Sequence, residues 1–147
     1  MRLEVAIFAA LLSFNMDSGS QVQPQSEFTI DQNYVLALST ANGFLCAWRR
    51  REQEAGLALL SPSLRSRHSE EEVRMWISGI SNPHHEAFEI GRGKRLRDGR
   101  YSFEVRLYEQ YTGAKYRQKR RKATSIVLSM SMDGEWLVDR LPYMAEQ

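Results

Sequence analysis

The stretch DGRYSFEVRLYE, residues 98–109, decides the fold that we predict for this chain. Its side chains alternate between an apolar set, Tyr101, Phe103, Val105 and Leu107, and a polar set, Arg100, Ser102, Glu104 and Arg106. A period of two is typical of a strand that buries one face. The Asp-Gly pair at 98–99 is typical of a tight hairpin, so we predict an earlier strand that contains Phe88, Ile90 and Leu96.

Two further strands follow. In ATSIVLSMSM, residues 123–132, one face carries Thr124, Ile126, Leu128 and Met130, and the other carries Ser125, Val127, Ser129 and Ser131. A second Asp-Gly pair, at 133–134, leads into EWLVDRLP, a last strand that Pro142 ends. Four strands in hairpin succession predict an antiparallel meander.

The chain before these strands has the period of a helix. A capping box of Thr29 and Gln32 precedes an apolar face at spacings of three and four, made of Tyr34, Leu38, Ala41, Leu45 and Trp48. The arginines at 49–51 lie where cations favour a helix end.

A short helix is predicted in EQEAGLALL, residues 52–60, and the Ser-Pro pair at 61–62 marks a new start. Ser69 and Glu72 form another capping box, followed by a predicted buried face of Val73, Trp76, Ile77 and Ile80. We count three helices and expect Trp48 and Trp76 to be buried. The predicted fold class is α+β, with three N-terminal helices packed on a four-stranded antiparallel sheet.

Three stretches carry a family resemblance: ANGFLCAWRRREQEAGLALLSPSLR at 41–65, DGRYSFEVRLYE at 98–109 and DGEWLVDRLP at 133–142. They resemble the long first helix, the central strand and the final strand of the nuclear transport factor two-like superfamily, the cone-shaped cystatin-like fold. The resemblance covers residues 30–142 and implies a curved sheet. Superfamily members include ketosteroid isomerase, scytalone dehydratase, polyketide cyclases, transport adaptors and small exported domains, so the fold does not choose a function.

The N-terminus has the features of an export signal. Arg2 precedes an apolar stretch, Val5 to Phe14, and small residues at Ser18 and Ser20 offer a cleavage site. We predict a signal peptide at 1–20, a linker at 21–29, one domain at 30–142 and a tail at 143–147. The stretch is too short to span a bilayer as a helix, so we expect no transmembrane segment in the mature form. The alternative is a cytoplasmic protein with an N-terminal extension.

Charge is concentrated in one segment. The formal net charge is +2, and the six cations Lys115, Arg117, Lys119, Arg120, Arg121 and Lys122 leave −4 for the rest of the chain. A specific nucleic-acid binder is usually basic over a whole face, so we expect none here. The segment lies between the second and third strands and is interpreted as a solvated hairpin tip. The alternative is a weak polyanion contact through those six residues.

An enzyme of this fold would need an acid, a base or an electrophile inside the cone. The predicted inward strand faces at 101–107 and 124–130 offer no carboxylate. The catalytic candidates are Asp139, which alternates with Leu137 and Leu141, Tyr34 on the first helix, and His85. Each has a structural alternative, which for Asp139 is a strand carboxylate paired with an arginine.

Other chemistry has little support in the sequence. No HxH or HxxxH spacing appears around His68, His84 and His85, so we predict no metal site and no cofactor. Cys46 lies among apolar residues and is interpreted as a buried thiol.

Two function classes remain, and a third class has less support in the sequence. The favoured one is a noncatalytic exported domain that binds a small apolar ligand or a protein partner through the cone or the sheet. The rival is a cone-cavity enzyme of isomerase, dehydratase or cyclase type, and the third is a weak polyanion binder. Members of the superfamily often form dimers through the sheet, but the polar outward set makes us expect a monomer or a weak homodimer here.

Overall fold

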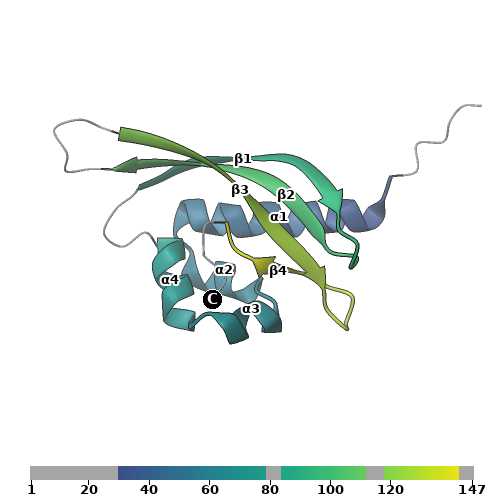
Figure 1. The fold of residues 1–147 in the computed structure, drawn as a ribbon. Helices are drawn as coiled ribbons and strands as arrows, with labels where there is room; N and C mark the ends of the chain where they lie inside the picture. The colour runs from purple at the N-terminus through teal and green to yellow at the C-terminus, as the bar shows by residue number, and fades with distance from the viewer. Residues whose placement is uncertain (1–29, 79–83, 112–117, 143–147) are drawn as a thin grey trace, which may run out of the picture.

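Four helices precede a four-stranded sheet in the computed structural model, which describes residues 30–78, 84–111 and 118–142 (Figure 1). The elements are α1 (Gln32–Arg50), α2 (Gln53–Ala58), α3 (Pro62–Arg67), α4 (Glu70–Ser78), β1 (His84–Arg95), β2 (Tyr101–Tyr111), β3 (Gln118–Met130) and β4 (Trp136–Arg140). The strands pair antiparallel in the order β1-β2-β3-β4, so the predicted meander is confirmed. Gly99 and Gly134, with φ of 87° and 83°, lie in the two Asp-Gly hairpins.

The count of three helices was wrong by one, because each of two capping serines begins its own helix. Ser61 Oγ accepts a hydrogen bond from the Leu64 N–H at 2.9 Å and starts α3. His68 then adopts an extended backbone, with φ −130° and ψ 141°, which ends that helix. At the start of α4, the Ser69 N–H donates to Glu72 Oε2 at 2.9 Å and the Glu72 N–H donates to Ser69 Oγ at 3.2 Å. This reciprocal pair is the predicted capping box.

Asp31 is the N-cap residue of α1. Its Oδ1 accepts hydrogen bonds from the N–H groups of Asn33 and Tyr34, at 3.0 and 3.3 Å. Its Oδ2 accepts one from the Tyr101 hydroxyl, which ties the start of α1 to β2. Thr29 and Ile80, each assigned above to a helix, lie outside the described residues.

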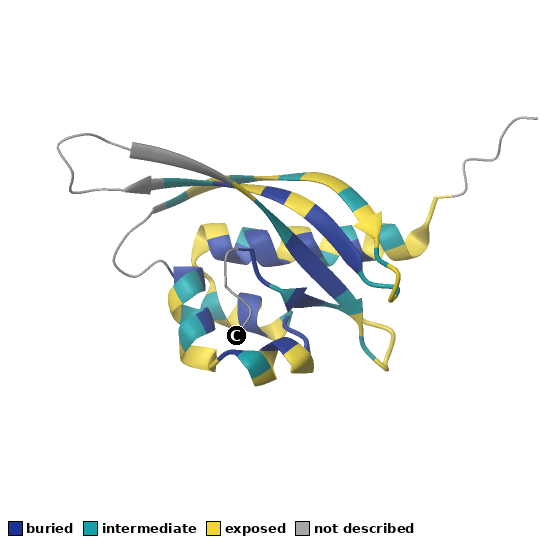
Figure 2. Cartoon of the chain, viewed as in Figure 1, coloured by how far each residue is buried: buried dark blue, intermediate teal, exposed yellow. Residues whose placement is uncertain are grey.

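The core lies where α1 crosses the inner face of the sheet, which curves over the helix (Figures 1 and 2). The predicted inward residues of β2 are all buried there, together with Ile126 and Leu128 of β3 and Phe44, Leu45 and Trp48 of α1. Met130, predicted to share this face, is 47% exposed because it is the last residue of β3, beside the hairpin.

The two tryptophans predicted to be buried differ. Trp48 is fully buried, as expected. Trp76 is only half-buried, because α4 packs on α1 and α2 at the margin of the core rather than beneath the sheet. Its ring stacks on Phe44, with 5.9 Å between the centroids.

The bond between Asp31 and Tyr101 predicts a pH dependence. The Tyr101 hydroxyl, with smaller help from the N–H groups of Tyr34 and Asn33, lowers the pKa of Asp31 below its ordinary value of 3.8. A lowered folded-state pKa stabilises the fold fully above the ordinary value, and the stabilisation is lost as the pH falls through the lowered one. Asn caps a helix as well as Asp does, so Asp31→Asn removes this titration and keeps the cap.

Urea unfolding of both proteins at about pH 5 and about pH 2.5 measures the effect. We expect the wild type to lose more unfolding free energy on acidification than Asp31→Asn. Equal losses in the two proteins would contradict the assignment.

Candidate functional site

Tyr34, the first catalytic candidate, is a packing residue of the core. Its ring lies against Tyr101 and Phe103, with centroids 5.8 and 5.3 Å away. Its hydroxyl oxygen accepts a long hydrogen bond, 3.4 Å, from the Gly93 N–H of β1. A Cβ on Gly93 would lie 2.4 Å from the Phe103 ring and 2.8 Å from that of Tyr34, so only glycine fits there. The phenol therefore lies in tight packing between helix and sheet.

His85, the second candidate, connects β1 to the last turns of α1 through a ring stack and a hydrogen bond. Its ring stacks on the Trp48 indole, with centroids 3.9 Å apart and planes 15° apart. Its Nδ1 lies 2.7 Å from the Trp48 carbonyl oxygen. A carbonyl oxygen can only accept, so Nδ1 carries the proton and donates. The same carbonyl oxygen also accepts a hydrogen bond from the Arg51 N–H at 3.2 Å, so His85 adds a second donor close to the C-terminus of α1.

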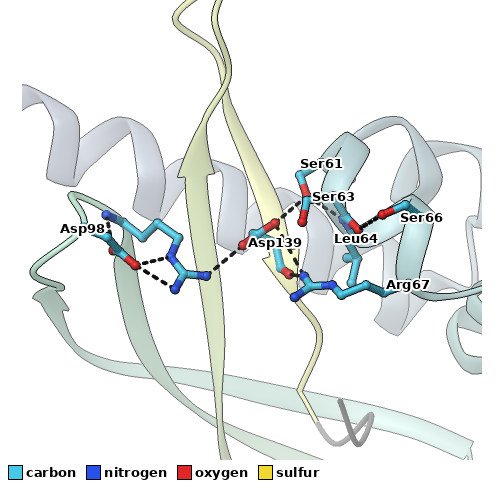
Figure 3. Close-up of polar contacts among 8 residues, drawn as sticks. Ser61, Ser63, Leu64, Ser66, Arg67, Asp98 and Asp139 are labelled. Atoms are coloured by element: carbon cyan, nitrogen blue, oxygen red, sulfur yellow. Dashed lines mark hydrogen bonds and ion pairs between the residues drawn. The ribbon is translucent and has the colours of Figure 1, made fainter. Parts of the chain in front are cut away.

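Asp139, the third candidate, is 6% exposed and bonded on both carboxylate oxygens (Figure 3). Ser61 Oγ donates to Oδ1 at 2.7 Å, and Arg100 Nη1 donates to Oδ2 at 2.9 Å. Arg67 forms an ion pair with Oδ1 at 3.5 Å and also donates to the Asp139 carbonyl oxygen. The pKa of Arg100 is raised, first by Asp98 and then by Asp139, so the guanidinium stays charged.

A bulge in β4 explains how Asp139 reaches these partners. Val127 of β3 pairs with Arg140 and the next residue, Leu128, pairs with Val138, which leaves Asp139 as the extra residue. Its carboxylate joins α3 and the β1–β2 hairpin to β4. This is the arginine-paired alternative considered for Asp139, in a buried setting.

The three candidates do not form one site. Tyr34 and Trp48 are fourteen residues apart on α1, about 21 Å along its axis, so Tyr34 and His85 lie at opposite ends of the helix. Asp139 contacts α3 and the hairpin that contains Arg100. The arrangement offers no acid–base pair among these residues for a shared substrate.

Aromatic rings fill the space between α1 and the sheet. Tyr101 packs against Tyr34, Phe103 and Trp136, with centroids 5.2–6.3 Å apart. At the other end of the helix, Trp48 and Trp76 pack at 6.2 Å. The indole N–H groups of Trp48 and Trp136 are buried, and neither has a hydrogen-bond partner among the described residues. The described aromatic side chains of the inner face thus pack between α1 and the sheet.

A polar concavity lies on the opposite face of the sheet, which we call the sheet-face pocket. Its volume is about 420 Å³, and its lining includes Arg92, Lys94, Ser102, Glu104, Val127 and Arg140. Ser102 and Val127 point away from α1 yet are only 8% and 2% exposed. The sequence assigned these residues to an outward face without indicating a pocket, since the pocket depends on how four strands align.

Four of the six cations of the basic segment belong to a strand. Lys119, Arg120, Arg121 and Lys122 belong to β3, whose backbone pairs there with residues 107–110 of β2. Lys115 and Arg117 lie outside the described residues. The placement of the segment between the second and third strands is correct.

Within residues 30–78, 84–111 and 118–142, no group of three or more His, Cys, Asp or Glu side chains could hold a metal ion. In that same part of the chain, no helix is both long enough and apolar enough to cross a membrane.

Comparisons with known proteins support the fold. No known protein-family profile matches the chain, and no similar curated protein was found. A ketosteroid isomerase-like protein from Erwinia carotovora atroseptica has a similar structure, with a TM-score of 0.60 and 14% identity over 79% of this chain and 100% of that one. ActVI-ORFA from Streptomyces coelicolor has a TM-score of 0.53 and 15% identity, over 72% of this chain and 92% of that one.

Both neighbours have the nuclear transport factor two-like fold, and this chain has it as well. Identities of 14% and 15% are evidence about the fold alone. The resemblance found in the sequence is confirmed at that level.

The contacts of Asp139 predict a structural rather than a catalytic effect of its removal. Asp139→Asn should lower the unfolding free energy by about 2 kcal/mol, because a buried charged acceptor is lost while its arginine partners keep some access to water. Asp98→Asn is the matched control, since Asp98 pairs with the same Arg100 on the surface and should have a smaller effect. If chemical denaturation shows the same loss of unfolding free energy in both variants, burial of Asp139 makes no additional contribution to stability.

Proposed function

We propose that this chain is a noncatalytic binding domain that uses the outer face of its sheet. The observation that carries the proposal is that each candidate catalytic group already serves the fold. Tyr34 packs between Tyr101 and Phe103, His85 holds the Trp48 carbonyl, and Asp139 joins α3 to the sheet. The sheet-face pocket is lined instead by side chains that the packing of α1 does not use.

The position of the pocket favours the sheet over the cone as the place of binding. An apolar ligand inside the cone would have to displace the rings of Tyr34, Phe103 and Trp136, each of which packs against Tyr101. Displacing packed aromatic side chains loses their buried area and their ring contacts. A ligand on the outer face requires no such change.

The isomerase-type alternative has a direct test. Purified protein is mixed with a β,γ-unsaturated 3-ketosteroid, and formation of the conjugated enone is followed by ultraviolet absorbance. We expect the rate to equal that in buffer, because the described groups offer no positioned base and proton donor to one carbonyl substrate.

The variants Tyr34→Phe and Asp139→Asn complete this test. Turnover by the wild type that either variant abolishes, at unchanged folded fraction, would overturn the proposal and establish an enzyme. Binding of the steroid without turnover would agree with a noncatalytic domain, but the ligand would then bind at a place other than the outer face of the sheet.

We also propose that the domain is exported. The support is sequence 1–20, with Arg2, the apolar stretch Val5 to Phe14 and the small residues near Ser20. Intact-mass spectrometry of protein made in its own host should show a chain that begins near Gln21. A chain that retains Met1 or Arg2 would refute export by a cleaved signal.

A further inference from the structure

The sheet-face pocket is formed by the lengths of side chains along one row across the sheet. The strand registers align Lys94 of β1 with Ser102 of β2, Ser102 with Val127 of β3, and Val127 with Arg140 of β4. Long side chains therefore stand on the two outer strands and short ones on the two central strands. Three strand spacings separate the outer pair by about 14 Å. The result is a trough of about 420 Å³ with a floor of Ser102 and Val127.

The β1 wall of this trough carries two positive charges, Arg92 and Lys94. Among the described residues, Arg92 and Lys94 have no ion-pair partner, and Glu104 is the acid that lines the pocket. Arg140 donates from Nη2 to Ser125 Oγ at 2.6 Å, which holds its guanidinium over the central strands. Arg100 also lines the pocket, but Asp98 and Asp139 neutralise its charge. Like charges gathered around a partly desolvated floor repel one another, and an anion relieves that repulsion.

We propose that the sheet-face pocket binds a small organic anion, through a carboxylate or phosphate group held between the β1 cations and Arg140. The cations supply charge-assisted hydrogen bonds, which are the strongest available to such a group. The hydroxyls of Ser102 and Ser125 can donate further bonds, and the methyl groups of Val127 support the body of the ligand. The volume lies in the range of small-molecule sites. This inference rests on the proposed binding function and specifies its ligand class.

The test is a titration of ¹⁵N-labelled full-length protein with phenyl phosphate and, in a second arm, with benzoate. Phenol is the neutral control. We expect saturable amide shifts at Lys94, Ser102, Val127 and Arg140 with at least one anion, and none there with phenol. The two arms separate a phosphate preference from a carboxylate preference.

Variants make the test specific. Lys94→Glu reverses a charge that has no partner among the described residues, so the fold should persist, and affinity should fall about tenfold or more, equivalent to about 1.4 kcal/mol or more. Arg50→Glu, the matched control, reverses an exposed charge on α1, away from the pocket, and should change affinity less than about twofold. Thermal melting confirms that both variants are folded.

Three outcomes would overturn the proposal. One is the absence of saturable shifts in the row with either anion. Another is an equal loss of anion affinity in both variants, which would mean that the anion responds only to the long-range electrostatic field of the protein. The third is binding confined to residues 118–122, which indicates a polyanion contact through the basic segment. These three outcomes refute anion binding in the sheet-face pocket but leave the proposal of a noncatalytic domain intact. Steroid turnover would refute that proposal, whether or not anions bind.

Discussion

The packing of α1 against the inner face of the sheet is the contact on which the rest of the structure depends. Hydrogen bonds join α1 to the sheet at both ends of the helix. Asp31 accepts one from Tyr101 at its start, and His85 donates one to the Trp48 carbonyl near its end. Between these ends, the rings of Tyr34, Tyr101 and Phe103 fill the space. The same fold can hold a cavity there, so the size of these side chains determines what the inner face can do.

Packing of these side chains changes the role of the polar groups near them. A tyrosine, a histidine and an aspartate are residue types that serve acid–base chemistry when they face a substrate. Here Asp139 is bonded on both oxygens, and the Tyr34 and His85 rings pack against aromatic neighbours. The face of the sheet away from α1 is therefore the better place for a ligand. On that face, the row from Lys94 to Arg140 forms a trough, because the two central strands carry short side chains there.

Local signals predicted most of the fold. The alternation at 101–107 and the two Asp-Gly pairs predicted the meander, and the Ser69–Glu72 box predicted the start of α4, because each depends on neighbours a few residues away. The site could not be predicted in the same way. The bond from His85 to Trp48 spans 37 residues, and that from Ser61 to Asp139 spans 78. The position of Asp139 needs a bulge, and the pocket needs the register of four strands, neither of which periodicity encodes.

The claim that aromatic side chains fill the cone is tested most directly by asking whether a small neutral apolar molecule binds inside it. Benzene is titrated into the wild type and into Phe103→Ala, and binding is followed by amide shifts of the core residues. Benzene enters an apolar cavity when one is created by truncating a large side chain. The account predicts no saturable binding by the wild type and binding by the folded variant. Saturable benzene binding by the wild type, with shifts at Tyr34, Tyr101 and Phe103, would show an open cone and contradict the account.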